Sequence, residues 1–546
     1  MPHNARILVS ALCVAATLSC GVTVWRLLDS PLRHDESDFG IQAAGIIEHG
    51  VPKVVDHGEV RYGMWHPPLY LYSVAASRFL FGPANWSSRL AGVAWFAATA
   101  IVVFRLAGPL ALCLLLLAPI VAQGILYLDI DNTSLAFALT LFGAVFVMAP
   151  RPHSMRTAAL LCAILFLALW SKLTTPYIML IAVVVFQVLN RDWRGTVQTV
   201  AIGAVATAAF LGAYLLYCRL TGYPVDFMFD TTYVGKRDSY LTSSRSLVKP
   251  LHAIWWNIIW FSPALTALFG VLTLERMRTF WRTRCADSID FWVIFAWAVF
   301  GAYAVWAGVM GKYTFPAAVA AAVALGLWLP GLVSTVRVKK PVLLTFAAAA
   351  LLTFQVLAVP ALQVKPAAAH EPLLTLSSGL THPRTVALSL VAAGFAVFTL
   401  VVSRAVSGPA LARVAVALLT CAMVANTVEA FKVMLSPDDR SPYRPLAERG
   451  FEPAVQRLNR VLSPADKLIG PKDVGYYFHG RAYRLDGIRH TTTGEADVVN
   501  TIRRSGVAYA VDSATNPVPD SDRLFREAGL QPIERVGDFV IYGLAK

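Results

Sequence analysis

The sequence predicts a polytopic α-helical membrane protein that carries a small α/β domain at its C-terminal end. Of its 546 residues, 57% are hydrophobic and only 15% are charged, whereas soluble proteins carry roughly 25% charged residues. Many of the hydrophobic residues lie in runs close to the length of about 20 residues that a helix needs to cross a bilayer. Beyond residue 431 the long apolar runs give way to short mixed segments.

Thirteen apolar segments are predicted to span the membrane. The first follows Arg6 and continues through Trp25, which is longer than the apolar region of a typical signal peptide, so we expect it to be retained. The predicted spans are residues 7–27, 88–106, 109–127, 133–149, 156–171, 176–190, 196–218, 252–274, 291–308, 313–330, 341–359, 385–403 and 411–431.

Basic residues in the short loops predict the orientation, because cytoplasmic loops carry an excess of Lys and Arg. With the N-terminus in the cytoplasm, the short outer links contain only Lys172 and Lys312. The net charge of +14 therefore indicates cytoplasmic loops and anionic lipid rather than nucleic acid. The basic residues of the inner side are Arg6, Arg105, Arg151, Arg156, Arg191, Arg194, Arg276, Arg278, Arg282, Arg284, Arg337, Lys339, Lys340, Arg404 and Arg413.

Two domains follow from this topology. Residues 1–431 form the membrane domain, and residues 432–546 form an α/β domain on the extracytoplasmic side of the cell membrane. Within the second domain, the residue pattern favours helices at 454–462, 496–502 and 522–528. It favours strands at 467–469, 507–511 and 539–542.

The outer loop 28–87 contains two predicted short amphipathic helices that lie along the membrane surface. The first follows Asp35 and Glu36 and ends at Gly50, and the second begins at His66-Pro67-Pro68. These helices would hold both carboxylates against the bilayer, although solvated loop carboxylates are an alternative. The apolar side of the second helix consists of Leu69, Tyr72, Ala76, Phe79 and Leu80.

A second acidic segment, Asp129-Ile130-Asp131, lies in the short link between the third and fourth spans. Its carboxylates could accept hydrogen bonds, orient a sugar or bind a divalent cation. A helix N-cap, formed by Asp131 or Asn132, is the alternative role for this segment. Lys172 and Lys312 are predicted at the same outer level. Both lysines could bind the phosphate of an anionic lipid carrier. The alternative is that their side chains only extend toward lipid headgroups.

Several other kinds of site find no support in the sequence. His34, His49, His57 and His66 share one loop, but their spacing matches no zinc pattern. No Walker loop, dinucleotide fingerprint, Gly-x-Ser-x-Gly elbow or Cys-x-x-Cys pair occurs. A nucleotide cofactor is therefore not expected.

The order of these features resembles the C-type glycosyltransferases (GT-C fold), which use polyprenyl-phosphate sugars. The resemblance is to bacterial relatives of protein O-mannosyltransferases and the lipid A aminoarabinose transferase. It covers roughly residues 7–330 and is strongest in 31–90. It rests on Asp35-Glu36, His66-Pro67-Pro68-Leu69-Tyr70, Phe81-Gly82, Arg89-Leu90, Asp131, Ser171-Lys172 and Lys312-Tyr313.

The resemblance implies roles for these residues. Asp35 matches the catalytic base, Glu36 is its neighbour, and Asp131 matches the acid of the second outer link. Lys312 stands where many relatives have Arg, which weakens a bidentate phosphate contact there. The phosphate-binding group consists of Lys172, Lys312, Tyr313 and Arg89, and the substrate-binding group consists of His66, Tyr70 and Asp129.

The use of a metal stays open. The Asp129-x-Asp131 pair also resembles the catalytic subunits of oligosaccharyltransferases, which require a metal. Asp35, Asp129 and Asp131 are the candidate ligands of a divalent cation.

The activity implied by the resemblance is inverting transfer of a sugar from a polyprenyl-phosphate carrier to a hydroxyl group of an envelope lipid, glycan or protein. A lipid-sugar flippase or other transporter, and a non-catalytic assembly protein, are the alternatives. A transporter is expected to place carboxylates near the membrane midplane, but the middle of nearly every predicted span lacks charge. In a glycosyltransferase, Asp35, Asp131 and Lys172 should converge on one cavity at the outer face.

Overall fold

The computed structural model describes residues 31–226, 263–305, 311–335 and 450–544, together with scattered residues between 14 and 29. Short gaps interrupt these ranges at 33–34, 57–58, 64–65, 151–152, 464, 471–476, 478–480, 486–487, 489–493 and 514–519. The predicted spans 341–359, 385–403 and 411–431 and the outer segments 227–251 and 360–384 lie outside the described residues.

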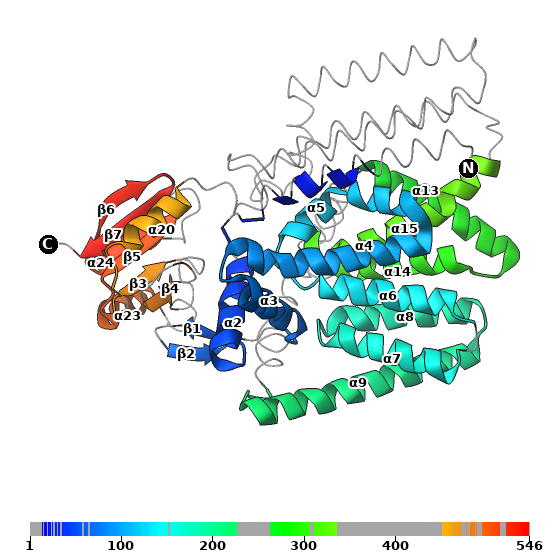
Figure 1. The fold of residues 1–546 in the computed structure, drawn as a ribbon, viewed down its shortest axis with the longest axis horizontal. Helices are drawn as coiled ribbons and strands as arrows, with labels where there is room; N and C mark the ends of the chain where they lie inside the picture. Colours follow the sequence, from blue (N-terminus) through cyan, green and yellow to red (C-terminus); the bar gives the residue numbers. More distant parts are fainter. Residues whose placement is uncertain are drawn as a thin grey trace, which may run out of the picture.

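Most of the described chain is a bundle of apolar helices (Figure 1). Two helices, α4 (Asn85–Leu116) and α9 (Trp193–Thr221), are long and apolar enough to cross a membrane. Shorter apolar helices accompany them. These are α3 (Leu69–Phe81), α6 (Ser134–Met148), α7 (Met155–Leu169), α8 (Thr174–Leu189), α14 (Ser288–Val305) and α15 (Phe315–Thr335).

The second and third predicted spans meet where α4 breaks. Gly108 has a φ of 78°, outside helical geometry, and Pro109 follows it. Glycine adopts a positive φ without the steric cost that a β-carbon would add. The chain then continues to Leu116 and re-forms a helix as α5 (Pro119–Leu126). The predicted span 109–127 therefore consists of two helical pieces.

Helix α15 is central to the bundle. Its residues from Ala317 to Leu325 are all buried, and it packs against α4 and α14. A helix that is apolar and buried all round belongs to the interior of a bundle. By contrast, α9 exposes apolar side chains such as Val197, Val200 and Leu216, as expected of a helix whose outer face meets lipid.

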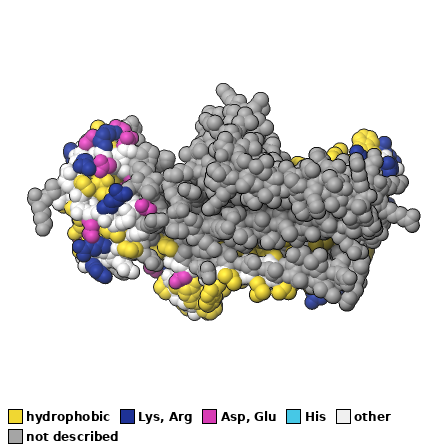
Figure 2. All heavy atoms as spheres, turned by 90° about the horizontal axis from the view of Figure 1, so that it is seen from above, with side chains coloured by type: hydrophobic (Ala, Val, Ile, Leu, Met, Phe, Trp, Pro, Cys, Tyr) yellow, Lys and Arg dark blue, Asp and Glu magenta, His cyan; other side chains and the backbone are white. Residues whose placement is uncertain are grey.

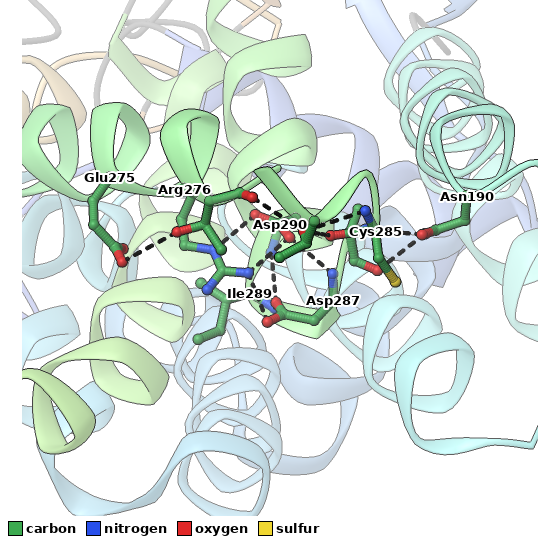
Figure 3. Close-up of polar contacts among 10 residues, drawn as sticks. Asn190, Glu275, Arg276, Cys285, Asp287, Ile289 and Asp290 are labelled. Carbon is green, nitrogen blue, oxygen red and sulfur yellow. Dashed lines mark hydrogen bonds and ion pairs between the residues drawn. The ribbon is translucent and has the colours of Figure 1, made fainter. Parts of the chain in front are cut away.

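Helix α13 (Pro263–Thr283) continues past the predicted end of its span at residue 274. The added turns carry Arg276, which forms ion pairs of 2.6 Å with Asp287 and 2.8 Å with Asp290 (Figure 3). These pairs fix the turn to α14, and Asn190 binds the Ala286 amide of the same turn at 2.8 Å. Charges beyond the apolar segment do not stop a helix, because they reach water and one another.

Both short helices of the outer loop are confirmed. Helix α2 (Asp35–His49) ends at Gly50, whose amide donates to the Ile46 carbonyl at 2.8 Å, and α3 ends at Gly82 in the same way, with Arg78 as acceptor. Both glycines have positive φ values. An unpredicted hairpin, β1 (Lys53–Asp56) and β2 (Glu59–Tyr62), connects the two helices.

The side of α3 predicted to be apolar faces outward. Phe79 and Leu80 are 76% and 71% exposed, whereas Tyr70, Leu71 and Val74 on the other side are buried in the core. Helix α3 is therefore apolar on both sides, with one side packed and one exposed. This arrangement suits a helix that lies between the bundle and a lipid surface.

Residues 450–544 contain a five-stranded sheet with helices on both faces (Figure 1). The strand order is β4 (Arg481–Arg484), β3 (Lys467–Gly470), β5 (Tyr509–Ser513), β7 (Phe539–Leu544) and β6 (Leu530–Val536). Strands β3, β4 and β5 are parallel, while β7 is antiparallel to β5 and β6. Helices α23 (Glu495–Ser505) and α24 (Ser521–Glu527) cover one face, and α20 (Phe451–Asn459) covers the other.

The surfaces of the two parts differ in kind. On the face shown in Figure 2, charged side chains of both signs are mixed over the sheet domain, whereas the coloured patches of the helical part are mainly apolar with a few basic side chains. A helix or strand of the predicted type overlaps each of the three helices and three strands predicted here, although α20 begins three residues earlier than predicted and β5 two residues later. The sequence missed β4 and β6, which are the two edge strands.

Candidate active site

A buried ion pair joins two loops on one end of the helical bundle. The Lys172 Nζ atom lies 2.7 Å from both carboxylate oxygens of Asp131, and both side chains are almost fully buried. Asp131 belongs to the link between α5 and α6, and Lys172 to the turn between α7 and α8. Burial is the largest single influence and lowers the pKa of the Lys172 ammonium, but the Asp131 carboxylate together with Tyr303 and Tyr313 raises that pKa above its usual range. Lys172 is therefore positively charged.

Two tyrosine rings surround the Lys172 ammonium. The Nζ atom lies 4.3 Å from the ring centroid of Tyr313 and 5.7 Å from that of Tyr303. The rings stack on each other at 5.4 Å, and the Tyr303 hydroxyl lies 2.7 Å from the Thr175 hydroxyl. A cation held over aromatic faces is attracted by the ring quadrupole. Tyr313 lies in η2 (Gly311–Thr314), directly before α15.

A second buried ion pair fixes the start of α2. Arg89, in the first turns of α4, donates from Nε and Nη2 to the two carboxylate oxygens of Glu36, at 3.0 Å each. Its Nη1 and Nη2 atoms also donate to the carbonyl oxygens of Leu28 at 3.0 Å and Pro31 at 3.1 Å. Arg89 and Glu36 are both almost fully buried. The guanidinium thus ties α2 and the preceding segment to α4.

The acidic link between α5 and α6 lies against α2. The Leu128 amide donates to the Glu36 Oε1 atom at 3.2 Å, which connects the two buried pairs. Within the link, the Asp131 amide donates to the Asp129 carboxylate at 3.2 Å, and the Thr133 hydroxyl donates to the Asp129 carbonyl oxygen. Asp129 therefore shapes the turn that aims Asp131 at Lys172.

Asn132 fixes the other side of this turn. Its side-chain amide donates to the carbonyl oxygen of Tyr127 at 3.0 Å and to that of Gly124. Both acceptors lie at the end of α5 or just after it. The alternative predicted for this segment was a helix N-cap, but the residue that precedes α6 is Thr133, and it has no capping hydrogen bond from its side chain.

Tyr70 of α3 is buried beside these acids. A β-carbon at Gly92 would lie 3.2 Å from the Tyr70 hydroxyl oxygen and 3.3 Å from the Thr133 methyl carbon, so glycine allows α4 to approach both. Burial raises the pKa of Tyr70, and the Asp129 and Glu36 carboxylates raise it further. The Tyr70 hydroxyl is therefore neutral.

The start of α3 reaches the loop that contains Lys172. The Leu69 amide donates to the Trp170 carbonyl oxygen at 3.2 Å. His66, which is half-buried, directly precedes Pro67 and Pro68 at this junction. In the same loop, the Ser171 hydroxyl donates to that of Ser134 at the start of α6, at 3.0 Å.

The structure thus brings most of the predicted site residues to one end of the bundle. Asp131, Lys172 and Tyr313 are in contact, and Glu36 is linked to them through Leu128. Asp35 is the first residue of α2 and Lys312 lies in η2, but the side chains of both are outside the described residues. Sequence reasoning missed Tyr303 and Thr175, which lie inside predicted apolar segments or at their ends and carry no charge to mark them.

In the part of the chain that the structure describes, no three His, Cys, Asp or Glu side chains gather as metal ligands. Both Asp131 carboxylate oxygens bind Lys172, and one Asp129 carboxylate oxygen accepts a backbone amide.

Comparisons with known proteins agree on the fold. No family model and no curated protein matches the sequence. The structure is similar to the crystal structure of ArnT from Cupriavidus metallidurans bound to undecaprenyl phosphate, with a TM-score of 0.61 and 17% identity, over 99% of this chain and 98% of that chain. ArnT in the apo state gives the same TM-score at 16% identity. An oligosaccharyltransferase from Archaeoglobus fulgidus gives a TM-score of 0.49 at 13% identity, over 99% of this chain and 74% of that chain. The chain therefore has the fold of ArnT over nearly the full length of both chains.

Proposed function

We propose that this protein is a membrane glycosyltransferase that moves a sugar from a polyprenyl-phosphate carrier to a hydroxyl group of an envelope lipid, glycan or protein. The observation that carries the proposal is the buried Asp131–Lys172 pair beside the Glu36–Arg89 pair, at one end of a bundle with the fold of ArnT. Such a site offers both a cation for a phosphate and carboxylates for proton transfer.

Lys172 is the proposed contact for the carrier phosphate. ArnT was crystallised with undecaprenyl phosphate, which supports a lipid phosphate as part of the donor. A charged lysine held between Asp131 and two tyrosine rings is already dehydrated, so a phosphate would meet it without displacing a full water shell. Lys312 and Tyr313, on the adjacent η2, complete the proposed phosphate-binding group.

Asp35 is the proposed general base. Its carboxylate accepts the proton of the acceptor hydroxyl while that oxygen attacks the anomeric carbon of the sugar. The new bond from carbon to the acceptor oxygen forms as the bond from carbon to the phosphate oxygen breaks, and the lipid phosphate leaves as an anion beside Lys172. A displacement in one step inverts the anomeric centre.

Glu36 and Arg89 receive positioning roles in this proposal. The Glu36 carboxylate is bound on both oxygens by Arg89, and it also accepts the Leu128 amide. The Arg89 guanidinium binds two backbone carbonyl groups in addition to this carboxylate. We therefore assign Arg89 to the placement of α2 rather than to the donor phosphate, and Glu36 to the orientation of Asp35. His66, Tyr70 and Asp129 remain proposed contacts to the substrates.

The distribution of charged residues argues against the alternative function, a transporter. In the described helices of the bundle, most charged residues lie near helix ends or breaks, as Arg89 does in the first turns of α4 and Arg105 shortly before its break at Gly108. A pump or flippase is expected to place ionisable groups along a path through the midplane.

The topology gives a prediction of its own. With thirteen spans, the sheet domain at residues 450–544 and the candidate site lie on the extracytoplasmic side. Alkaline phosphatase fused after Lys546 should therefore be active, because this reporter folds only outside the cytoplasm, and a green fluorescent protein fused there should be dark. Fluorescence of the fusion at this position would contradict the predicted number of spans. It would also mean that the candidate site lies on the cytoplasmic side, away from the expected lipid-linked donor.

The direct test of the proposal is transfer by the purified protein. Radiolabelled sugars on polyprenyl phosphate are supplied as donors, and an envelope extract from a deletion strain is supplied as acceptor. The expected result is transfer of label to one class of acceptor. Mass spectrometry should show that the same class of molecule lacks this sugar in the deletion strain. Net movement of the intact donor across a liposome, without release of free polyprenyl phosphate, would instead support a flippase.

A further inference from the structure

Tyr477 connects the sheet domain to the outer loop of the helical part. Its ring packs against the apolar cores of both parts. Its hydroxyl accepts a hydrogen bond from the Leu32 amide, and it is placed to donate to the Leu32 carbonyl oxygen at 3.2 Å or to the Asn85 Oδ1 atom at 3.1 Å. The Asn459 side chain, which ends α20, donates to the Tyr477 carbonyl oxygen at 2.9 Å and so fixes this residue to its own domain.

The segment bound by Tyr477 is the one that holds Arg89. The carbonyl oxygens of Leu28 and Pro31 accept from the Arg89 guanidinium at 3.0 and 3.1 Å, and Leu32 directly follows Pro31. The same guanidinium donates hydrogen bonds to both carboxylate oxygens of Glu36. Leu28 and Pro31 therefore contact the buried ion pair through Arg89, and Tyr477 binds the neighbouring residue Leu32.

The N-terminus of α4 binds the same segment. The Asn85 amide group donates to the Asp29 carbonyl oxygen at 3.4 Å, and the Trp86 backbone amide donates to the Asp29 carboxylate at 3.3 Å. Asn85 thus contacts both Tyr477 and the segment that Tyr477 fixes. The Tyr477 phenol therefore joins Leu32, the start of α4 and the sheet domain, while β4 of the sheet domain also contacts β1 of the outer loop.

We propose that Tyr477 is a positioning residue for the transfer reaction. Its hydroxyl holds Leu32 and, next to it, Pro31, which binds Arg89; Arg89 in turn binds Glu36 and so sets the start of α2. This inference rests on the function proposed above. A general base must lie within hydrogen-bond reach of the proton that it removes. Displacement of α2 should therefore slow the chemical step, while Lys172, which lies on a different loop, should bind the donor as before.

The test compares Tyr477→Phe with Tyr542→Phe in the full-length protein. Tyr477→Phe keeps the ring packed in both cores and removes only the hydroxyl. Tyr542 is a matched control, because its hydroxyl binds the Asp522 carboxylate at 3.0 Å within the sheet domain, away from the outer loop. Both variants are assayed for sugar transfer, for thermal unfolding and for deuterium exchange of backbone amides in residues 28–40.

Tyr477→Phe is expected to lower kcat on the order of tenfold, within the range of up to about a hundredfold for a misplacement of 1 Å. The donor KM should stay within about twofold of wild type, since ground-state binding is retained. Amide exchange in residues 28–40 should become faster, and Tyr542→Phe should change neither kcat nor this exchange. Asn85→Ala combined with Tyr477→Phe should lower kcat less than the product of the two single effects, because both changes break one junction.

Unchanged exchange in residues 28–40 of Tyr477→Phe would overturn the inference, as would an equal loss of kcat in Tyr542→Phe. The exchange measurement needs no substrate. A wild-type protein that transfers no sugar would therefore contradict the proposed function and leave the test of the Tyr477 contact intact.

Discussion

Replacement of Asp35 by Asn is expected to lower kcat for sugar transfer by about 10²–10⁴-fold, the usual contribution of a general base. Asp35 opens α2, whose position is set by the buried pair of Glu36 and Arg89. Asn has nearly the same shape as Asp but cannot accept the proton of the acceptor hydroxyl. The measurement is the rate of transfer from purified polyprenyl-phosphate sugar at saturating donor and acceptor.

Glu36→Gln is the matched control for Asp35→Asn. It should reduce kcat less and lower the melting temperature more, because it removes the carboxylate that neutralises buried Arg89. Asp35→Asn should melt like the wild type. Near-normal turnover of Asp35→Asn with an inactive but stable Glu36→Gln would reverse the two roles. If neither change slows transfer, Asp129 and Asp131 are the next carboxylates to test.

Replacement of Lys172 by Met should affect both stability and donor use. Removal of one partner from a buried ion pair leaves the other charge uncompensated, which typically costs about 3–5 kcal/mol. The Lys172 and Asp131 side chains are only 6% and 3% exposed, so water cannot replace the lost contact. The free energy of unfolding should fall by that amount, and the donor KM should rise because the proposed phosphate contact is gone.

The double variant Lys172→Met with Asp131→Asn separates these two effects. It contains no unpaired charge at this position, so it should recover most of the lost stability. It should not recover donor binding, because the ammonium is still absent. A double variant that regains the wild-type donor KM would show that Lys172 serves only to neutralise Asp131. The readouts are thermal unfolding in detergent and transfer rates over a range of donor concentrations.

The sequence by itself determined the elements whose signals are local. The apolar runs marked the described spans, and the break between two of them falls at Gly108, whose positive φ ends the helix. Gly50 and Gly82 marked the ends of the two outer-loop helices, and short apolar runs marked β3, β5 and β7 in the interior of the sheet. Each of these signals lies within a few residues of the element that it predicts.

The elements that the sequence missed have weak local signals. Strands β4 and β6 lie at the sheet edges, where β6 exposes most of its residues and contains Pro532. Edge strands commonly carry charges and proline, since these discourage pairing with other chains, and so they lack an alternating apolar pattern. The hairpin of β1 and β2 is the exception among the missed elements, because Val54, Val55 and Val60 favour strands and form a usable signal.

The candidate site was predicted in its residue types but not in its contacts. Asp35, Glu36, Asp131 and Lys172 stood out because charges are costly near a membrane. Only the tertiary structure paired Lys172 with Asp131, across 41 residues, and Arg89 with Glu36, across 53. It also placed the uncharged Tyr303 ring within reach of the Lys172 ammonium.

Tyr477 is the extreme case, since its hydroxyl binds Leu32 across 445 residues. Neither residue carries a charge, a glycine or a motif that would single it out. Local sequence patterns report helix and strand formation, because these depend on backbone geometry and on the spacing of apolar side chains. Which loops meet depends on how the whole bundle packs, and so the partner of each buried charge and the contact of Tyr477 emerged only from the folded chain.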